Sequence, residues 1–282
     1  MTFLNLKAQD ASVRNQFPQY FTTFSIGRLK TLLVLLALLI LLVIGIEQLE
    51  LKWDRIFTGL LRLGDIVILM LPPDPGWGSL FNSYLAAMLE TISIAFVGTF
   101  VAAFIAIPLS LIAARNTTLN SLMQFLSRRT FDTLRGVDIL IWALIWINVV
   151  GLGPFAGALA IICVDVGSFG KLFSEALEAV DKNPTEGIKS SGGNRLQQIQ
   201  FGVVPQVLPV FFSQILYFFE ANTRSATIIG IVGAGGVGFI LSEQIRSLQF
   251  QQLSFVILLI LITVSFIDLL SARLRHALIQ PH

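Results

Sequence analysis

Long uncharged runs of apolar residues dominate the chain and predict membrane-spanning helices. Runs of about 17–25 such residues cross a hydrocarbon core near 30 Å thick. A Gly-rich apolar stretch at 225–241 follows the fifth run and leaves the helix ends there undefined. The predicted spans, by approximate residue number, are 31–46, 91–114, 137–150, 154–170, 207–224 and 253–272. We therefore expect about six transmembrane helices.

The composition supports this interpretation. Of the 282 residues, 55% are hydrophobic and 13% are charged, whereas a soluble domain is about 25% charged. One core cannot bury this much apolar surface, so the chain needs lipid as a second solvent. A net charge of +2 is too small to indicate nucleic-acid binding, and the single cysteine, Cys163, excludes an intrachain disulfide. With two histidines, His276 and His282, a Cys/His zinc site is not expected. The predicted class is an all-α polytopic membrane protein.

Lys and Arg residues are distributed unevenly between the predicted loops. Of 19 such residues, 14 share one side if that side holds the N-terminal tail, 115–136, 171–206 and the C-terminal tail. Cytoplasmic loops carry this excess, so both termini are predicted to be cytoplasmic. Between the first two spans, charged residues are interspersed with Leu, Ile and Phe. This pattern predicts an amphipathic helix lying in the outer interface.

The predicted cytoplasmic loop contains the sharpest local pattern. Asn183 is a good N-cap, Pro184 suits the first helical position, and Glu186 at the third position completes a capping box. Gly192 or Gly193 supplies the left-handed residue that ends a helix. About two turns of helix result, which is too short to be stable alone in water.

A second helix start follows directly. Asn194 is followed by Gln197 at the third position, which predicts a new helix that Pro205 interrupts at the membrane. The whole segment is either an ordinary connector between two membrane helices or a rigid element that docks into a cytoplasmic partner.

The spacing of three residues in this loop resembles a known family. Glu186 is followed by Gly192 six residues on and by Pro205 thirteen further, as in the permeases of binding-protein-dependent ABC importers. The sequence departs from that family at 187–188, where Gly and Ile replace two usual alanines, and at Gly202, which replaces a usual Ile.

Longer stretches make the resemblance more specific. They are VGLGPFAG at 150–157, GKLF at 170–173, FGVVPQVLP at 201–209, FEANTRSAT at 219–227 and IVGAGGVG at 231–238. Together they resemble the phosphonate-transport permeases over roughly residues 90–270. They do not distinguish phosphonate, phosphite and related phosphorus oxyanions.

The resemblance implies a non-enzymatic permease subunit with a type I ABC importer fold in a bacterial inner membrane. Two permease copies, expected to be a homodimer, would form the path, and an external substrate-binding protein would deliver the solute. A dimer of cytoplasmic ABC ATPases would bind ATP and Mg, because this chain has no Gly-x4-Gly-Lys-Ser/Thr motif. No cofactor or metal is expected on this chain. The residues implied in ATPase coupling are Asn183, Pro184, Glu186, Lys189, Gly192, Gly193, Arg195 and Pro205.

The predicted spans and loops divide the chain into consecutive parts. A cytoplasmic tail is followed by the first span, a periplasmic loop with the interfacial helix, the permease core with its coupling loop 171–206, and a second cytoplasmic tail. These parts are 1–30, 31–49, 50–82, 83–272 and 273–282.

Polar residues lie at or near the predicted outer end of the fifth helix. Glu220 and Arg224 are four residues apart and can pair on one helix face. Alternatively, the planar guanidinium of Arg224 helps an oxyanion pass, while Glu220 restrains it between cycles. With Asn222, Ser225 and Thr227, these residues are the candidates for the substrate path.

Gly233, Gly235, Gly236 and Gly238 formally satisfy the dinucleotide-binding pattern G-x-G-x-x-G. A dinucleotide site also needs an acid about 20 residues later, and 254–261 contains none. We instead expect close helix packing or a helix break, and a break that faces the solute path is the functional version.

The remaining acids near the spans are scattered over different helices, which argues against a proton-coupled path. Asp138 and Asp268 are expected to be solvated, and Asp165 to hydrogen-bond between helices. Trp142 and Trp146, four residues apart, are expected to pack against lipid or core.

Three alternatives stay open at this stage. The same importer architecture could carry another cargo, such as an amino acid. An ion-coupled secondary carrier would lose uptake with the ion gradient and would tolerate scrambling of 184–191. A structural membrane subunit would have no path of its own.

Overall fold

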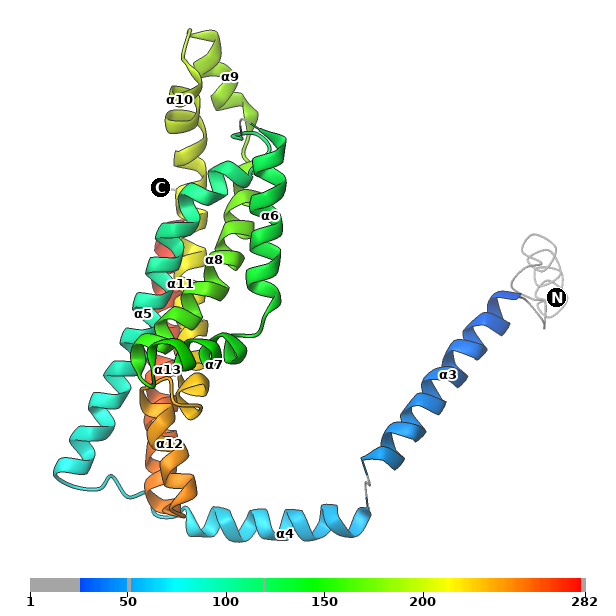
Figure 1. Ribbon diagram of the computed structural model, residues 1–282, viewed down its shortest axis with the longest axis vertical. Coiled ribbons are helices and arrows are strands. Elements are labelled where there is room, and N and C mark those ends of the chain that lie inside the picture. The colour runs from blue at the N-terminus through cyan, green and yellow to red at the C-terminus, as the bar shows by residue number, and fades with distance from the viewer. Residues whose placement is uncertain (1–25, 50–51, 119, 280–282) are drawn as a thin grey trace, which may run out of the picture. The chain divides into compact units, whose positions relative to one another are not determined.

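The computed structural model describes residues 26–49, 52–118 and 120–279. Throughout this part of the chain the regular secondary structure is helical (Figure 1), which confirms the predicted all-α class. Most of the predicted tail 1–30, and His282, lie outside the described residues.

The chain divides into two units, of which the first is Met1–Asp65. It contains α3 (Ile26–Gln48) and most of α4 (Trp53–Leu69). α3 is long and apolar enough to cross a membrane. α4 is the helix expected after the first span, and it begins with Asp54 in its first turn, where a negative charge is favourable. Its place in the outer interface stays a prediction.

The second unit, Ile66–His282, contains the other helices. Within the described residues, five helical stretches including α3 are long and apolar enough to cross a membrane, or six if α6 and α7 form one bent span. This agrees with the predicted number. The bounds are α5 (Ser79–Ala113), α6 (Ser121–Gly136), α7 (Ile139–Val150), α8 (Pro154–Glu178), α9 (Lys182–Ser190), α10 (Arg195–Gln197), the π-helix η1 (Gln198–Val203), α11 (Val204–Ile231), α12 (Val237–Arg246) and α13 (Phe250–Ile279).

The charges of segment 115–136 predicted a loop, but the segment is largely helical. Most of it forms α6, which packs along α8, where two glycines leave room for it: a Cβ at Gly170 would come 2.5 Å from the Phe131 ring, and one at Gly167 would come 2.8 Å from the Phe131 carbonyl oxygen. The predicted third span, 137–150, corresponds to α7 alone, which has 12 residues. It reaches the length of a membrane span only together with α6, to which it stands at an angle of 89°. Asp138 stands at this bend as the N-cap of α7.

Two further predicted helix ends are wrong. α5 begins at Ser79, well before 91, and α11 continues past Arg224 to Ile231. Pro205 does not interrupt the helical path, because it lies in the first turn of α11, where a missing N–H costs little. In a regular α-helix the proline ring clashes with the carbonyl group four residues earlier. That residue lies in η1, whose wider π turns leave room for the ring.

Small residues allow α5 and α8 to pack closely. Ala95, Ala102 and Ala106 on α5 are completely buried, and a Cβ at Gly98 would come 2.7 Å from a side-chain carbon of Ile161 on α8. In lipid, where helices gain little from hydrophobic burial against one another, such close backbone approach supplies the van der Waals contact that holds them.

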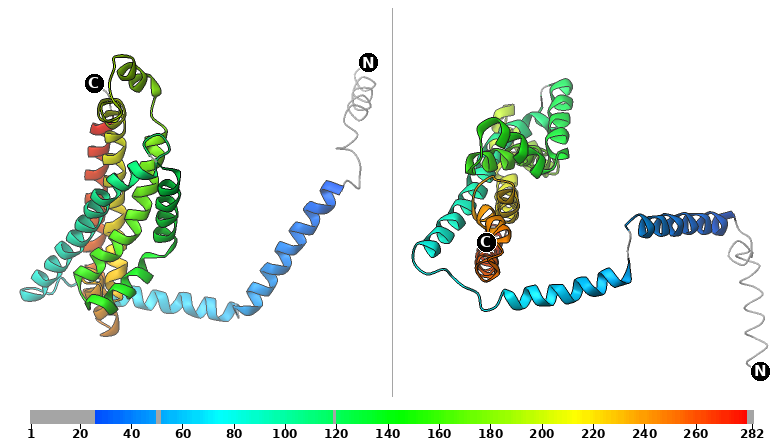
Figure 2. Two further views of the ribbon diagram at one scale, coloured as in Figure 1. Left: turned by 45° about the horizontal axis from the view of Figure 1, so that its top comes forward. Right: turned by 60° about the horizontal axis from the view of Figure 1, so that its bottom comes forward.

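α9 and α10 lie at one end of the second unit, near the loop between α5 and α6, and α7 and α12 lie toward the other end (Figures 1 and 2). α13 runs from the end that holds α12 back toward the end that holds α9. The α5–α6 loop therefore lies at the same end of the second unit as α9 and α10 (Figure 1).

Candidate functional site

The N-terminus of α9 differs in detail from the prediction. Asp181, not Asn183, is the N-cap, and its carboxylate accepts a hydrogen bond from the Asn183 N–H at 3.1 Å. Pro184 is consequently the third helical residue, and Glu186 takes no part in a capping box. Asp181 takes the N-cap position because its carboxylate accepts a backbone N–H that has no partner within the first turn of the helix. Lys189 lies in the last turn, where a positive charge is favourable.

α9 ends at Ser190, and Gly192, two residues later, has the left-handed backbone conformation predicted for one of the two glycines, with φ of 84°. Gly193 then donates its N–H to the Ile188 carbonyl at 2.9 Å. A Cβ at Gly193 would come 2.8 Å from that same oxygen, so both glycines are needed for this turn. The predicted capping box of Asn194 and Gln197 is present and starts α10.

η1 packs against α9 through the residue that departs from the family pattern. A Cβ at Gly202 would come 2.7 Å from Thr185 Cγ2 and 3.3 Å from Ile188 Cδ1. The absence of a side chain at 202 therefore makes room for Ile188, which stands where the importer family usually has Ala. Among its described residues α9 has none that is buried, and Asn183, Pro184 and Glu186 stand exposed. α9 is a supported helix with a free outer face.

Arg195 connects α10 to the loop between α5 and α6. Its guanidinium donates to the carbonyl oxygens of Thr117 at 3.3 Å and Thr118 at 2.9 Å. The family resemblance implied Arg195 in coupling, but no sequence pattern indicated these partners, which are 77 and 78 residues away.

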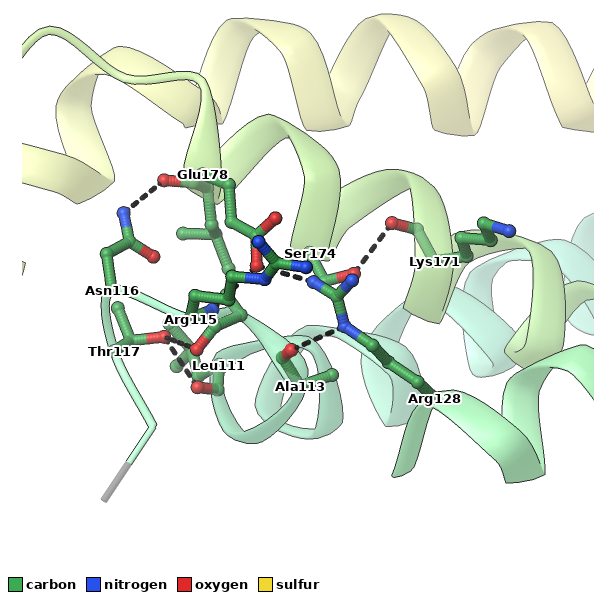
Figure 3. Close-up of polar contacts among 11 residues, drawn as sticks. Leu111, Ala113, Arg115, Asn116, Thr117, Arg128, Lys171, Ser174 and Glu178 are labelled. Carbon is green, nitrogen blue, oxygen red and sulfur yellow. Dashed lines mark hydrogen bonds and ion pairs between the residues drawn. The ribbon is translucent and has the colours of Figure 1, made fainter. Parts of the chain in front are cut away.

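The same loop is tied to the end of α8 (Figure 3). The Asn116 side-chain amide donates to the Leu177 carbonyl, and the Glu178 carboxylate accepts from the Arg115 backbone N–H at 2.7 Å. The Glu178 carboxylate also pairs with the guanidinium of Arg128 on α6. The loop after α5, the middle of α6, the end of α8 and the start of α10 therefore form one hydrogen-bonded junction.

Gln206 ties α11 to the segment in front of α9. Its amide oxygen accepts the Asp181 N–H at 3.0 Å, and its amide nitrogen donates to the Asp181 carbonyl at 3.2 Å. No local sequence pattern marks Gln206, although it directly follows Pro205. The base of α9 is thereby held to the membrane-spanning helix α11.

Glu220 is the centre of an ionic cluster on α11. Its carboxylate, 8% exposed, accepts from Arg224 at 2.9 Å and from Arg275 of α13 at 3.3 Å. The predicted pair of Glu220 and Arg224 is confirmed, whereas Arg275 was not foreseen. The Arg224 side chain is 50% exposed. Because α11 continues to Ile231, the cluster lies within the helix, and its predicted place at the outer end is wrong.

Asn222 belongs to a different, buried cluster. Its amide nitrogen donates to Thr99 of α5 at 2.8 Å and to the carboxylate of Asp165 of α8. The helix-to-helix hydrogen bond expected for Asp165 is therefore present. Asn222 is 5% exposed, so the structure separates it from the exposed Arg224 and gives it a contact that joins three helices.

Ser225 and Thr227 satisfy their hydroxyls within α11, by donating to the carbonyls of Ala221 and Thr223 at 3.3 Å each. Gly238 packs against this part of the helix so closely that any Cβ there would overlap the Thr227 carbonyl oxygen. Close helix packing is thus the structural reason for Gly238.

The predicted helix break is present between α11 and α12. Gly233, Gly235 and Gly236 have positive φ values of 103°, 85° and 72°, a conformation that favours glycine. Glu90 accepts the Gly236 N–H at 3.0 Å, and Thr91 accepts the Val237 N–H at 2.8 Å. The carboxylate of Glu90 therefore stabilises the N-terminus of α12 from within α5.

Trp142 and Trp146 on α7 pack, as expected, against a buried cluster of residues from α5, α8 and α11, and their indole N–H groups point at protein atoms. The indole N–H of Trp142 donates to the Leu134 carbonyl at 3.2 Å, and that of Trp146 lies 3.3 Å from the sulfur of Cys163. Asp268 is exposed, as expected.

Comparison with known proteins identifies the architecture. Residues 106–280 match the family described as "Binding-protein-dependent transport system inner membrane component". A protein of Stutzerimonas stutzeri named as a phosphite transport permease, HtxC, is 38% identical over 231 residues, which are 82% of this chain and 81% of that protein. The phosphite transport system permease protein PtxC of the same species is 34% identical, over 78% of this chain and 79% of that protein.

Solved structures agree with this result at the level of the fold. A chain of the MetNI methionine ABC transporter, in an inward-facing conformation, aligns with a TM-score of 0.62. The alignment covers 72% of this chain and 100% of that chain at 18% identity, so the likeness concerns the fold alone.

Proposed function

The chain belongs to the family of binding-protein-dependent transport system inner membrane components, and we propose that it forms the path for phosphonate, phosphite or a related phosphorus oxyanion in an ATP-driven importer. It is a multi-pass inner-membrane transport subunit. The names of HtxC and PtxC support a phosphorus cargo.

The observation that carries the proposal is the guanidinium of Arg224. It is half exposed on α11, a helix long enough to cross the membrane, and it is bound to a carboxylate that is almost completely buried. A planar guanidinium forms paired, charge-assisted hydrogen bonds with phosphonate or phosphite oxygens. An oxyanion on the path would compete with Glu220 for Arg224, and Arg275 would keep Glu220 paired during that exchange.

Coupling to ATP is assigned to α9. Its exposed face would dock into a separate ABC ATPase, which would bind ATP and Mg. Movement of α9 would reach α11 through Gln206 and would reach α5, α6 and α8 through Arg195. We further propose that α9 and both chain termini lie in the cytoplasm, as the distribution of Lys and Arg predicts.

The complete importer requires further partners. We infer a second permease copy, most simply an identical one, so that two sets of helices enclose the path. An external binding protein would deliver the oxyanion, and a dimer of ATPases would serve the two α9 helices.

Uptake into proteoliposomes tests the proposal. The vesicles would contain the permease with its co-expressed ATPase, with ATP inside and the binding protein with labelled methylphosphonate or phosphite outside. We expect uptake that needs both ATP and the binding protein. Uptake driven by an ion gradient without ATP would support a secondary carrier instead. Absence of uptake for both labels, with the ATPase still bound, would refute the phosphorus cargo.

A further inference from the structure

A basic pocket lies between α6 and α8 beside the α5–α6 loop, away from the Glu220 cluster. Its volume is about 310 Å³. The charged residues that line it are Arg115, Arg128, Arg129, Asp132 and Lys171, and Ser174 and Gln124 add polar groups. Arg115, Arg128 and Ser174 are seen together in Figure 3, with Lys171 on the same helix as Ser174.

The positive charge of this pocket is only partly neutralised. Arg128 is paired with Glu178. Asp132 is shared by three cations, at 3.5 Å from Arg129, 3.5 Å from Lys171 and 3.7 Å from Arg135. Such long, half-exposed pairs contribute little stability and exchange easily with an incoming anion.

Arg115 adds a further cation to the pocket. Its backbone N–H donates to Glu178, and its exposed guanidinium forms no ion pair within the described part of the chain. The pocket therefore offers a fork of donors, backed by an excess of positive charge, that an oxyanion can complete.

An apolar strip on α6 adjoins the pocket. Leu122, Phe125 and Leu126 are 62%, 56% and 55% exposed, and they share the helix face that leads to Arg129. The Arg129 guanidinium lies 5.2 Å above the centre of the Phe125 ring. A free inorganic anion makes no favourable contact with exposed apolar side chains, whereas the acyl chains of a lipid would cover them.

From this arrangement we propose that the pocket binds the phosphate of an anionic glycerophospholipid of the cytoplasmic leaflet. Arg115, Arg129 and Lys171 contact the phosphate, and the acyl chains lie along Leu122, Phe125 and Leu126. The leaflet rests on the orientation given under the proposed function, whereas the binding itself does not. Basic pockets between helices on the cytoplasmic side are known to hold such headgroups. The bound lipid would clamp α6 to α8 next to the junction that Arg195 joins.

Lipid titration of the purified full-length chain tests this site without any transport measurement. Native mass spectrometry in detergent would count adducts of phosphatidylglycerol and phosphatidylcholine. The test variant is Arg115→Gln with Lys171→Gln, which leaves the Arg128–Glu178 pair intact. The matched control is Arg246→Gln with Arg273→Gln, two exposed arginines that do not line the pocket. Asp132→Asn removes the acid that competes with the lipid.

We expect phosphatidylglycerol to bind in preference to phosphatidylcholine, and about tenfold more weakly to the test variant than to the control. Asp132→Asn should bind it more tightly than the wild type, which supports the site even if the test variant fails to fold. Equal binding of the two lipids, or equal losses in the test and control variants, would overturn the proposal. So would displacement of phosphatidylglycerol by an equal concentration of inorganic phosphate, which would make this a site for the free ion. An absence of transport would refute the proposed function and leave these results unchanged.

Discussion

Gly202 of η1 lies directly against Thr185 of α9: a Cβ at Gly202 would come 2.7 Å from Thr185 Cγ2. The importer family usually has Ile at this position and Ala at 188, where this chain has Ile188. The two departures compensate each other, because the volume lost from η1 is taken up by α9. This contact packs α9 closely against η1.

Restoring the family's residue at 202 should therefore impair this protein. Gly202→Ile should destabilise the α9 region by about 1–3 kcal/mol, through overpacking against Thr185, and should reduce ATP-dependent uptake. Thr185→Ala in the same chain should recover part of the loss. Thermal unfolding in detergent and uptake measure the two effects.

Gly187 offers the matched control. It also stands where the family has Ala, but nothing lies within 4 Å of a Cβ built there. Gly187→Ala should raise helix stability by about 0.5–1 kcal/mol and preserve uptake. If Gly202→Ile were as well tolerated as Gly187→Ala, the packing argument for α9 would fail.

Arg195 should transmit movement between α10 and the α5–α6 loop through its hydrogen bonds. Arg195→Ala removes two hydrogen bonds to the Thr117 and Thr118 carbonyls and should cost about 1–2 kcal/mol. We expect the ATPase to stay bound but ATP hydrolysis to become less dependent on the binding protein. Lys189→Ala, a change in the same segment at an exposed position, tests docking of α9 itself. If ATP hydrolysis by the Arg195→Ala variant depended on the binding protein as strongly as in the wild type, these hydrogen bonds would have no role in coupling.

Removing Glu220 should leave two guanidinium groups without their shared carboxylate. Glu220→Ala should lower stability by about 1–3 kcal/mol, a value kept small because Arg224 is half exposed to screening. Glu220→Ala combined with Arg275→Ala should recover part of this loss. The double-mutant cycle, measured by thermal unfolding, isolates the pair, and strictly additive effects would show that the two groups are not coupled.

Arg224 has a separate prediction, because its guanidinium is the group offered to the cargo. Arg224→Ala should lower oxyanion uptake about tenfold, the loss of a charge-assisted hydrogen bond, while ATPase binding is unchanged. Arg224→Lys should recover uptake only in part, since a lysine lacks the planar fork. Normal uptake by Arg224→Ala would leave this residue with a purely structural role.

Local patterns predicted the elements whose cause is local. The capping box of Asn194 and Gln197, the left-handed Gly192, and the pairing of Glu220 with Arg224 all depend on residues within a few positions of one another. The break at the Gly-rich segment belongs to the same class. Each of these features follows from backbone or helix geometry alone.

Features that join distant segments could not be predicted in this way. The charges of 115–136 indicated a loop, yet most of the segment forms α6. Its Arg128 and Asp132 pair with Glu178 and Lys171 of α8, and two glycines of α8 leave room for Phe131. Arg275 reaches Glu220 from 55 residues away. The wrong N-cap of α9 has a local cause instead: the pattern from Asn183 to Glu186 favours Asn183, whereas the Asp181 carboxylate, two residues earlier, accepts the Asn183 N–H.

ATP hydrolysis by the assembled importer tests the central claim most directly. The permease and its ATPase would be placed in nanodiscs, and hydrolysis measured with the binding protein alone, with the binding protein loaded with phosphite or methylphosphonate, and with methionine as the alternative cargo. The account predicts stimulation by the loaded binding protein, with a phosphorus oxyanion as the effective ligand, and loss of that stimulation in Gly202→Ile. Hydrolysis that ignores the loaded binding protein, or that responds to the amino acid alone, would contradict it.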